Sequence, residues 1–212
     1  MTSLDQIARA AHDQLFGHIL PFWTGPALEH EQGGWLAWMS NDLQVDRSQP
    51  KGLIVNSRIL WTFSAVHRFQ PDPLYRQMAD RAFDVVMNRF WDPQYGGAFW
   101  RLDGDGRVLD ASKKTYGQAF YIYALAEYHL AFGAPSALKR AVELFDLLER
   151  HARDARQGGY WEVRRRDWSE AADSRLSDKD LNEKKSMNNH LHVLEAFTNL
   201  YRTTSHPRVA QC

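Results

Sequence analysis

This 212-residue chain contains a single cysteine and has no formal net charge, and each of these features excludes a class of protein. The single thiol, Cys212, cannot form a disulfide within the chain, and this cysteine usage suits a reducing compartment. Lys plus Arg and Asp plus Glu both number 26, so the formal net charge is zero. A neutral chain gives no electrostatic reason to expect nucleic acid or an anionic membrane as a partner.

Long apolar runs are also missing. The N-terminal stretch MTSLDQIARAAHDQLF interleaves charged and apolar side chains, so it does not have the pattern of a signal peptide. No run approaches about 18 consecutive apolar residues, the length that a membrane-spanning helix needs. We therefore expect a cytoplasmic protein without a membrane partner.

Aromatic residues, in contrast, are abundant: 8 Trp, 8 Tyr and 11 Phe. Apolar residues recur every three or four positions in long segments, which predicts amphipathic helices. Pro21 is expected to close the first helix, Ser112 to cap the fourth and Gly133 to end it. The six predicted helices cover residues 4–22, 52–69, 73–91, 112–132, 135–153 and 183–203.

No strand pattern alternates with these helices, so an all-α fold is predicted rather than an α/β fold. A repeat is visible instead, because GGWLAWM, GGAFWRL and GGYWEVR begin at Gly33, Gly96 and Gly158, spaced by 63 and 62 residues. Each copy follows one helix, and a lysine-bearing segment then precedes the next helix. We expect a single domain, residues 1–212, of three helical hairpins whose long loops carry small β-hairpins.

The last predicted helix carries two polar positions of interest. Asn188 and His192 are four residues apart and share a face, whereas His190 and His192 point about 200° apart and do not form a chelating pair. An apolar stripe of the same helix is expected to pack against its neighbours: Met187, Leu191, Leu194, Phe197 and Leu200. A lone histidine on a helix is also compatible with a purely structural role.

Four residues near the starts of the second, fourth and sixth helices are predicted to meet where the long loops gather. They are Arg58, Tyr116, Asn188 and His192. Arg58 has Ile54 and Trp61 as helical neighbours, and a guanidinium on an apolar face needs an acidic or ligand partner. A loop carboxylate and a bound ligand both remain possible partners for it.

Three long segments closely resemble cellobiose 2-epimerases of the N-acylglucosamine 2-epimerase family. The segments are NDLQVDRSQPKGLIVNSRILWTFSAVHRF (41–69), KKTYGQAFYIYALAEY (113–128) and RLSDKDLNEKKSMNNHLHVLEAFTNLYR (175–202). The resemblance implies an (α/α)6 barrel of six hairpins. Six hairpins of this length need about 400 residues, so the chain resembles the N-terminal half of such a barrel.

The resemblance also implies a reaction and a set of site residues. The family epimerises C2 of the reducing-end glucose of cellobiose and related β-1,4 disaccharides, through a cis-enediolate and without a metal or organic cofactor. Arg58 matches a residue that stabilises developing negative charge, and Tyr116 matches a sugar-contacting phenol. Asn188 and His192 match residues that bind the oxygens of the reacting sugar, and His192 also matches a group that assists ring opening.

The family's two proton-transferring histidines lie in the half that this sequence does not contain. We therefore expect the 212-residue chain alone to be inactive. We also expect it to self-associate, with Leu53, Leu60, Phe197 and Leu200 partly exposed at the flanks of the half barrel.

Other functions remain open from the sequence. Within the family they are an N-acylglucosamine 2-epimerase or a mannose isomerase, and outside it a non-catalytic carbohydrate-binding fragment. A glycoside hydrolase is the third class, but no pair of facing carboxylates stands out. The loop carboxylates available for it are Asp42, Asp92, Glu162, Asp178 and Asp180.

Overall fold

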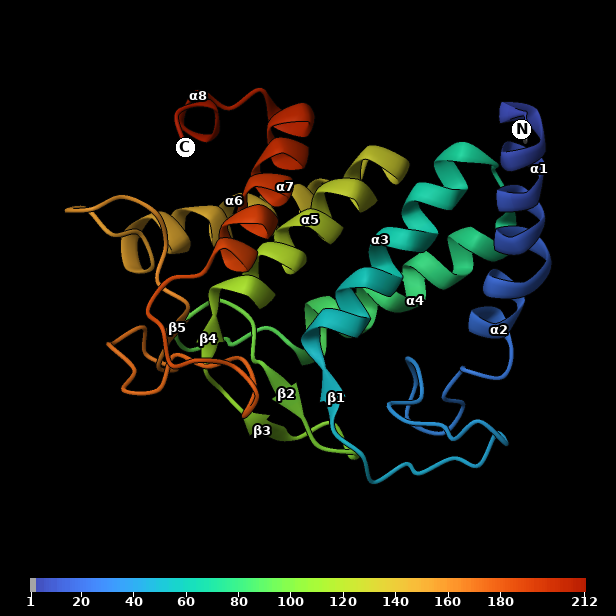
Figure 1. Cartoon of the computed structure of the whole chain (residues 1–212), viewed down its shortest axis with the longest axis horizontal. Coiled ribbons are helices and arrows are strands. Elements are labelled where there is room, and N and C mark those ends of the chain that lie inside the picture. The colour runs from blue at the N-terminus through green and yellow to red at the C-terminus, as the bar shows by residue number, and fades with distance from the viewer. Residues whose placement is uncertain (1–2) are drawn as a thin grey trace.

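The computed structural model of the protein describes residues 3–212 and is dominated by helices (Figure 1). Ser3 caps the first helix through a capping box with Gln6, and Gly133 ends α5 in the left-handed conformation that glycine favours. The helices are α1 (Leu4–Gln14), a π-helical segment (Leu15–Ile19), α2 (Leu20–Thr24), α3 (Leu53–Phe69), α4 (Pro73–Arg89), α5 (Thr115–Phe132), α6 (Pro135–His151), α7 (Met187–Thr204) and α8 (Pro207–Ala210).

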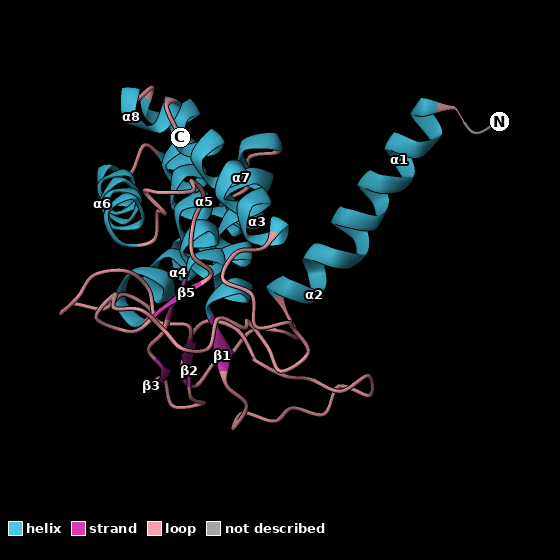
Figure 2. Ribbon diagram, turned by 60° about the vertical axis from the view of Figure 1, so that its left-hand side comes forward, coloured by secondary structure: helices cyan, strands magenta, loops and turns pink. Residues whose placement is uncertain are grey.

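The strands are short and lie in the loops. A three-stranded antiparallel sheet has the order β1-β2-β3, and β4 pairs with β5 in a second antiparallel sheet. Figure 2 shows that the strands and long loops gather on one side of the helices. The strands are β1 (Lys51–Gly52), β2 (Arg101–Leu102), β3 (Val108–Asp110), β4 (Lys113–Lys114) and β5 (Val163–Arg164).

The three Gly-Gly segments adopt one common turn, as the repeat predicts. Both glycines of each pair have a positive φ, a backbone conformation that a side chain disfavours. In every turn the backbone N–H of an acidic residue donates to the carbonyl of the second glycine. The donor–acceptor pairs are Glu29 with Gly34, Asp92 with Gly97, and Asp154 with Gly159.

The helices form two layers. The inner layer is a row of α3, α5 and α7, in which α5 packs against both of the others, and α4 and α6 cover this row from outside (Figures 1 and 2). All three inner helices begin on the side where the loops gather, so their first turns share one end of the molecule. Helix α1 projects away from this group, and none of its residues is buried.

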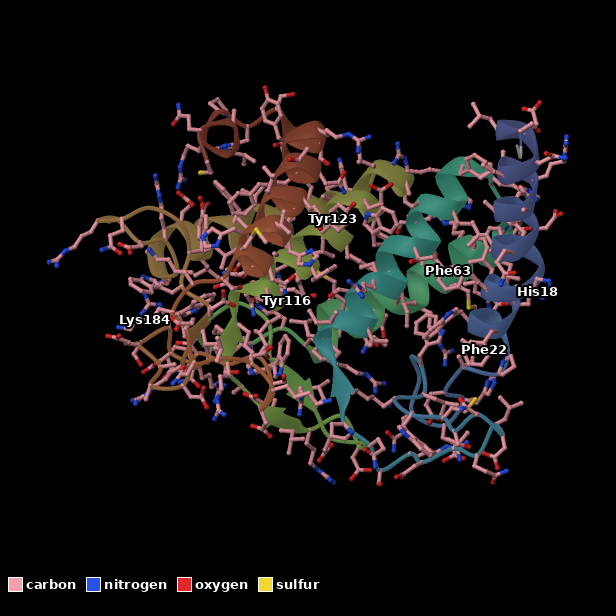
Figure 3. The ribbon with its side chains drawn as sticks, viewed as in Figure 1. His18, Phe22, Phe63, Tyr116, Tyr123 and Lys184 are labelled. Carbon is pink, nitrogen blue, oxygen red and sulfur yellow. The ribbon has the colours of Figure 1, made fainter. Side chains whose placement is uncertain are left out.

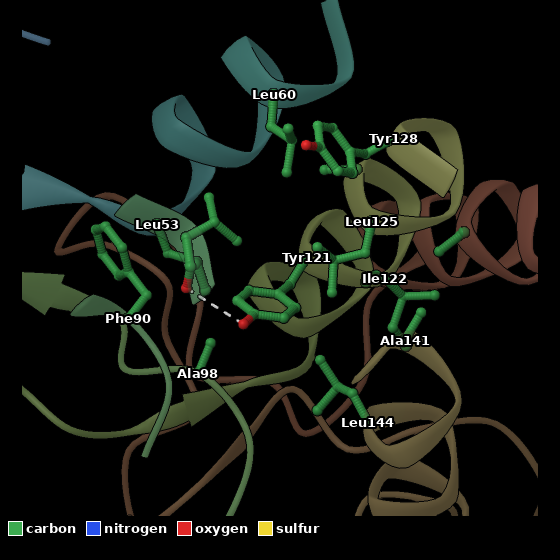
Figure 4. Packing of buried hydrophobic residues seen from close by; sticks show 14 of the residues in the cluster. Leu53, Leu60, Phe90, Ala98, Tyr121, Ile122, Leu125, Tyr128, Ala141 and Leu144 are labelled. Carbon is green, nitrogen blue, oxygen red and sulfur yellow. Dashed lines mark hydrogen bonds between the residues drawn. The ribbon is translucent and has the colours of Figure 1, made fainter. Parts of the chain in front are cut away.

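One cluster of buried apolar side chains runs through all three hairpins, from Leu20 to Val209. Tyr121 of α5 lies near its centre, fully buried beside Leu125 and Leu144 (Figure 4). Its hydroxyl donates to the Val86 carbonyl at 3.2 Å, so the polar end of this ring is satisfied within the core.

Several predicted helix boundaries are wrong. The last predicted helix begins at Met187, after Ser186 as its cap, and not at residue 183. Pro21 does not close the first helix, because the helical backbone continues from the π-helical segment into α2, and Pro21 lies in the first turn of α2. Ser112 does not cap α5, since Lys113 and Lys114 pair with β5 and the helix begins only at Thr115. The segment GGWLAWM forms two isolated bridges, from Trp35 to Leu28 and from Met39 to Val45.

The predicted burial of the flanks is also wrong, in two ways. Leu53, Leu60, Phe197 and Leu200 are buried and not partly exposed, because all four point into the cluster between the inner and outer layers. Within the predicted apolar stripe of α7, in contrast, Met187, Leu191 and Leu194 are exposed.

Within residues 3–212, every helix is too short or too polar to span a bilayer.

Candidate active site

An acidic residue and a lysine hold each of the later two Gly-Gly turns. Asp92 and Lys113 form an ion pair of 3.0 Å in which both side chains are fully buried, and Lys113 also donates to the Gly97 carbonyl at 3.3 Å. Lys185 pairs in the same way with Asp154. We call these ion pairs the second clasp and the third clasp, after the Gly-Gly turns that they hold. They explain why a lysine precedes the inner helix in the second and third repeats.

The environment of the second clasp shifts both of its pKa values. Burial would raise the pKa of Asp92, but hydrogen bonds from Arg166 and Lys113 outweigh burial and hold that pKa well below its usual range. Burial lowers the pKa of Lys113 to about 8, against the attraction of Asp92. Asp92 is therefore committed to a structural ion pair.

A polar side chain five residues after each lysine joins the inner helix to its own loop. Gln118 accepts from the Ala98 N–H at 2.7 Å and donates to the Ala98 carbonyl at 2.9 Å. In the third hairpin His190 takes this place, because its Nε2 accepts from the Tyr160 N–H at 2.9 Å. His190 is thus a structural histidine, and this bond holds α7 in the rotation that turns His192 the other way.

Phe120 of α5 is contacted by side chains from both neighbouring inner helices. The Arg58 guanidinium lies 4.7 Å from the centroid of the Phe120 ring, and the His192 ring lies 4.6 Å from it on the other neighbouring helix. Tyr116 is one helical turn before Phe120 and meets His192 edge-on at a centroid distance of 4.7 Å. One residue from each inner helix therefore converges on a single aromatic ring.

His192 is oriented by a carboxylate on its own helix. Its Nδ1 lies 2.7 Å from an Oε of Glu195, three residues later. A carboxylate accepts at this distance, so it favours the tautomer with the proton on Nδ1 and leaves Nε2 as a free base. This arrangement suits a group that takes or gives a proton to a ligand.

A groove of about 320 Å³ lies over these residues. Trp61 and Tyr123 stack at a centroid distance of 5.3 Å on one wall, and Figure 3 shows Tyr116 and Tyr123 in the middle of the molecule between α3 and α7. An aromatic wall with a few charged groups is the usual lining of a small-molecule site. The lining residues are Arg58, Trp61, Thr62, Phe120, Tyr123, His192 and Glu195.

The structure therefore brings three of the four predicted site residues together: Arg58, Tyr116 and His192. Asn188 is exposed one turn before His192 in α7 and is not among the residues that line the groove. Sequence reasoning missed Phe120 as the common contact, although its i+4 spacing from Tyr116 places both on one helix face. Glu195 was not predicted as a site residue either.

Two of the candidate loop carboxylates, Asp92 and Glu162, have structural roles. Asp92 is held in the second clasp, and Glu162 is buried and accepts from the Ser186 N–H at 2.6 Å at the start of α7. Burial raises the pKa of Glu162, while the bond from Ser186 opposes that shift. Both carboxylates support helix starts, so neither is free to act on a ligand.

Comparison with known proteins decides the family. Residues 34–210 match the N-acylglucosamine 2-epimerase (GlcNAc 2-epimerase) family. This chain belongs to the N-acylglucosamine 2-epimerase family. A cellobiose 2-epimerase of Bacteroides fragilis is 42% identical over 196 residues, which are 92% of this chain and 50% of that protein.

Solved structures of the family agree with this fold. The cellobiose 2-epimerase of Spirochaeta thermophila superposes with a TM-score of 0.92 at 42% identity, and the alignment covers 98% of this chain and 51% of that one. The cellobiose 2-epimerase of Bacillus thermoamylovorans gives 0.93 at 35% identity, covering 98% and 53%. The chain thus spans about half the length of these relatives, and its fold is about half of an (α/α)6 barrel.

In this family member, a long loop is held at the start of α5 by Lys114. Lys114 Nζ donates to the Arg175 carbonyl at 3.0 Å and to the Leu176 carbonyl at 3.1 Å, while it lies 4.8 Å above the Trp100 ring. Lys114 is two residues before Tyr116, so the loop is held against the start of α5. Residues 175–176 therefore lie over the start of α5.

Proposed function

We propose that this chain carries one wall of the active site of a sugar 2-epimerase. The proposed substrate is the reducing-end glucose of cellobiose or a related β-1,4 disaccharide, converted to mannose. The observation that carries the proposal is the convergence of Arg58 and His192 on Phe120 beneath an aromatic groove. Membership of the family and the names of its most similar relatives support it.

The proposed reaction needs a base, a stabiliser of negative charge and a sugar platform. In the open-chain sugar, removal of the C2 proton beside the carbonyl gives a cis-enediolate, and return of a proton to the other face gives the epimer. Arg58 is the proposed donor to the enediolate oxygens, because a fixed cation lowers the energy of charge that develops in the transition state. Tyr116 and Asn188 are proposed to bind sugar hydroxyls.

His192 is proposed to serve the sugar oxygens and ring opening. With its Nδ1 proton held by Glu195, Nε2 can accept a proton from the anomeric hydroxyl and return it later. A single base addresses one face of C2 only. For this reason we propose that residues 1–212 alone bind the sugar but epimerise it poorly, and that a second base completes the cycle.

Sugar binding is tested first, on residues 1–212 with cellobiose and saturation-transfer NMR. Arg58→Ala should weaken binding, and Arg76→Ala is the matched control, because Arg76 also lies 4.7 Å above a phenylalanine ring, Phe132, but on the outer layer. N-Acetylglucosamine and mannose are compared in the same assay to separate the family's substrate classes. Equal loss of binding in the two arginine variants would reject the groove as the sugar site.

Catalysis is tested in a chimera that joins this chain to the complementary half of the Bacteroides fragilis relative. Arg58→Ala should lower kcat for cellobiose epimerisation by roughly a hundredfold or more, as loss of one oxyanion donor typically does. Unchanged conversion in Arg58→Ala would reject its role. For residues 1–212 alone, exchange of the C2 proton with solvent deuterium at an enzyme-like rate would contradict the need for a second base.

A further inference from the structure

The row of inner helices ends in two open flanks. On the α7 flank, Met187, Leu191 and Leu194 recur at helical spacing and are 79%, 51% and 65% exposed. Thr198 and Tyr201 continue the same line, which itself carries no charge, and Glu195 and Arg202 border it. A contiguous apolar stripe of this kind usually marks a surface that another protein covers.

The other end of the row offers a groove instead of a ridge. Between α2 and α3 lies a hollow of about 280 Å³ whose lining is apolar except for Arg58 and Thr62. Val55 and Ile19 on its rim are about half exposed. Its lining residues are Ile19, Leu20, Trp23, Val55, Arg58, Ile59, Thr62 and Phe63.

These two flanks lie at opposite ends of the row, α7 at one end and α2 with α3 at the other (Figure 1). Helix α5 shows how an inner helix is covered when it has neighbours, since it packs against α3 on one side and α7 on the other. Each open flank lacks such a neighbour among residues 3–212. Because the α7 stripe and the α2–α3 groove lie at opposite ends of the row, they cannot contact each other within one molecule and can pair only between two.

We propose that a second copy of this chain covers both flanks, with α7 of each copy seated along the α2–α3 groove of its partner. A twofold axis parallel to the inner helices keeps all six of them pointing the same way and makes the two contacts identical, so the assembly closes. Two copies supply six hairpins, and the family's solved structures have about twice the length of this chain.

The size of the contact fits a stable dimer. An eighteen-residue helix is about 27 Å long, and the symmetry provides two such seams. Stable protein interfaces bury about 1,200–2,000 Å² in total, a range that two helix-length apolar seams can supply. The inference depends on the fold and on the exposed side chains, and it does not depend on the proposed reaction.

The test measures the mass of residues 1–212 in solution by light scattering coupled to gel filtration. We expect about 49 kDa, twice the 24.6 kDa of one chain. A double variant, Leu191→Glu with Leu194→Glu, should give monomer. Leu109→Glu is the matched control, because Leu109 is 57% exposed on β3, away from both flanks, and it should leave the dimer intact.

A mixing experiment identifies which surfaces pair. Val55→Arg, on the groove side, should also give monomer. A mixture of Val55→Arg with the double glutamate variant should recover dimer, because one seam of the mixed pair is unaltered and the other places Arg opposite Glu. Circular dichroism and thermal melting of each variant check that the chain still folds.

The outcomes are decisive in each direction. A wild-type monomer at tens of micromolar would overturn the second copy as occupant and leave a further segment of a longer chain to cover the flanks. A dimer that survives both sets of variants would overturn the proposed surfaces. Open-ended oligomers would overturn the closed twofold arrangement.

Discussion

The middle inner helix α5 and the last inner helix α7 have the same length, 18 residues, but very different surroundings. Twelve residues of α5 are buried and only six of α7. Composition accounts for part of the difference, because α5 is the more apolar helix. It does not account for all of it, since α7 also carries apolar side chains, such as Leu191 and Leu194, on the flank that has no neighbour. Burial in this architecture therefore also depends on the number of adjacent hairpins.

The Gly-Gly turns show the same contrast between the middle and the end of the row. A Cβ added at Gly96 of the second turn would meet Leu147 of α6 at 2.7 Å, whereas one added at Gly158 of the third turn would meet nothing within 4 Å. The first and second turns pack under the outer helix of the following hairpin, α4 and α6 respectively. The third turn lies at the end of the described row and has open space in that place.

The largest expected effect on stability comes from comparing a leucine substitution in α5 with one in α7. Leu125→Ala in α5 removes a fully buried side chain and should lower the free energy of unfolding by about 2–5 kcal/mol. Leu194→Ala in α7 should change it by less than about 0.5 kcal/mol at concentrations low enough to keep the chain monomeric. Urea unfolding followed by circular dichroism measures both, and equal losses would contradict the contrast.

A glycine pair tests the contrast within the turns. Gly96→Ala and Gly158→Ala carry the same backbone cost, since φ is 68° and 72° at these positions. Only Gly96→Ala must also displace Leu147, so it should be the more destabilising by about 1–3 kcal/mol. Differential scanning calorimetry of both variants gives the comparison, and equal melting temperatures would show that the second turn is as open as the third.

His190 tests whether the third hairpin depends on its link between helix and loop. His190→Ala leaves the buried Tyr160 N–H without its acceptor and should cost about 1–2 kcal/mol. His190→Gln should cost less, because Gln118 makes the equivalent bond with an amide oxygen in the second hairpin. If the two substitutions lower the free energy of unfolding in urea equally, the hydrogen bond to the Tyr160 N–H does not contribute to stability.

The smallest effect concerns pH and the third clasp. The hydrogen bond from Lys185, followed by backbone N–H donors, lowers the pKa of Asp154 from its ordinary value of 3.8 to about 2. A carboxyl with a depressed folded-state pKa stabilises the fold above its unfolded pKa, and that stability is lost as the pH falls. Unfolding free energy should therefore decline from about pH 4 toward pH 2, and Asp154→Asn should flatten the decline.

Much of the fold is predictable from the sequence because helical periodicity and the Gly-Gly repeat are local signals. The hairpin count and the end of α5 at Gly133 follow from them. The start of α5 does not, since it depends on pairing between Lys113–Lys114 and a strand some fifty residues later, at Val163–Arg164. A strand of two residues has no periodicity that a sequence pattern could reveal.

The site was predictable to a similar extent. Arg58, Tyr116 and His192 share a position near the start of an inner helix, so the repeat alone brings them to one end of the molecule. Phe120 has no polar group, so its sequence position does not indicate a site residue. Its contacts with Arg58 and His192 form only when α3 and α7 lie on either side of α5. In the same way, the exposure of Leu191 and Leu194 depends on which helices are adjacent, and periodicity does not carry that information.

The restriction of helix packing to adjacent hairpins has a consequence for the way the chain is made. Contacts of α5 reach back to α3 and α4 and forward to α6 and α7, so each hairpin needs little beyond its immediate predecessor for docking. The ribosome releases the N-terminal segment first, at about 5–20 residues per second. Folding can therefore follow synthesis one hairpin at a time. The apolar flank of the most recently folded hairpin stays exposed until the next hairpin docks on it.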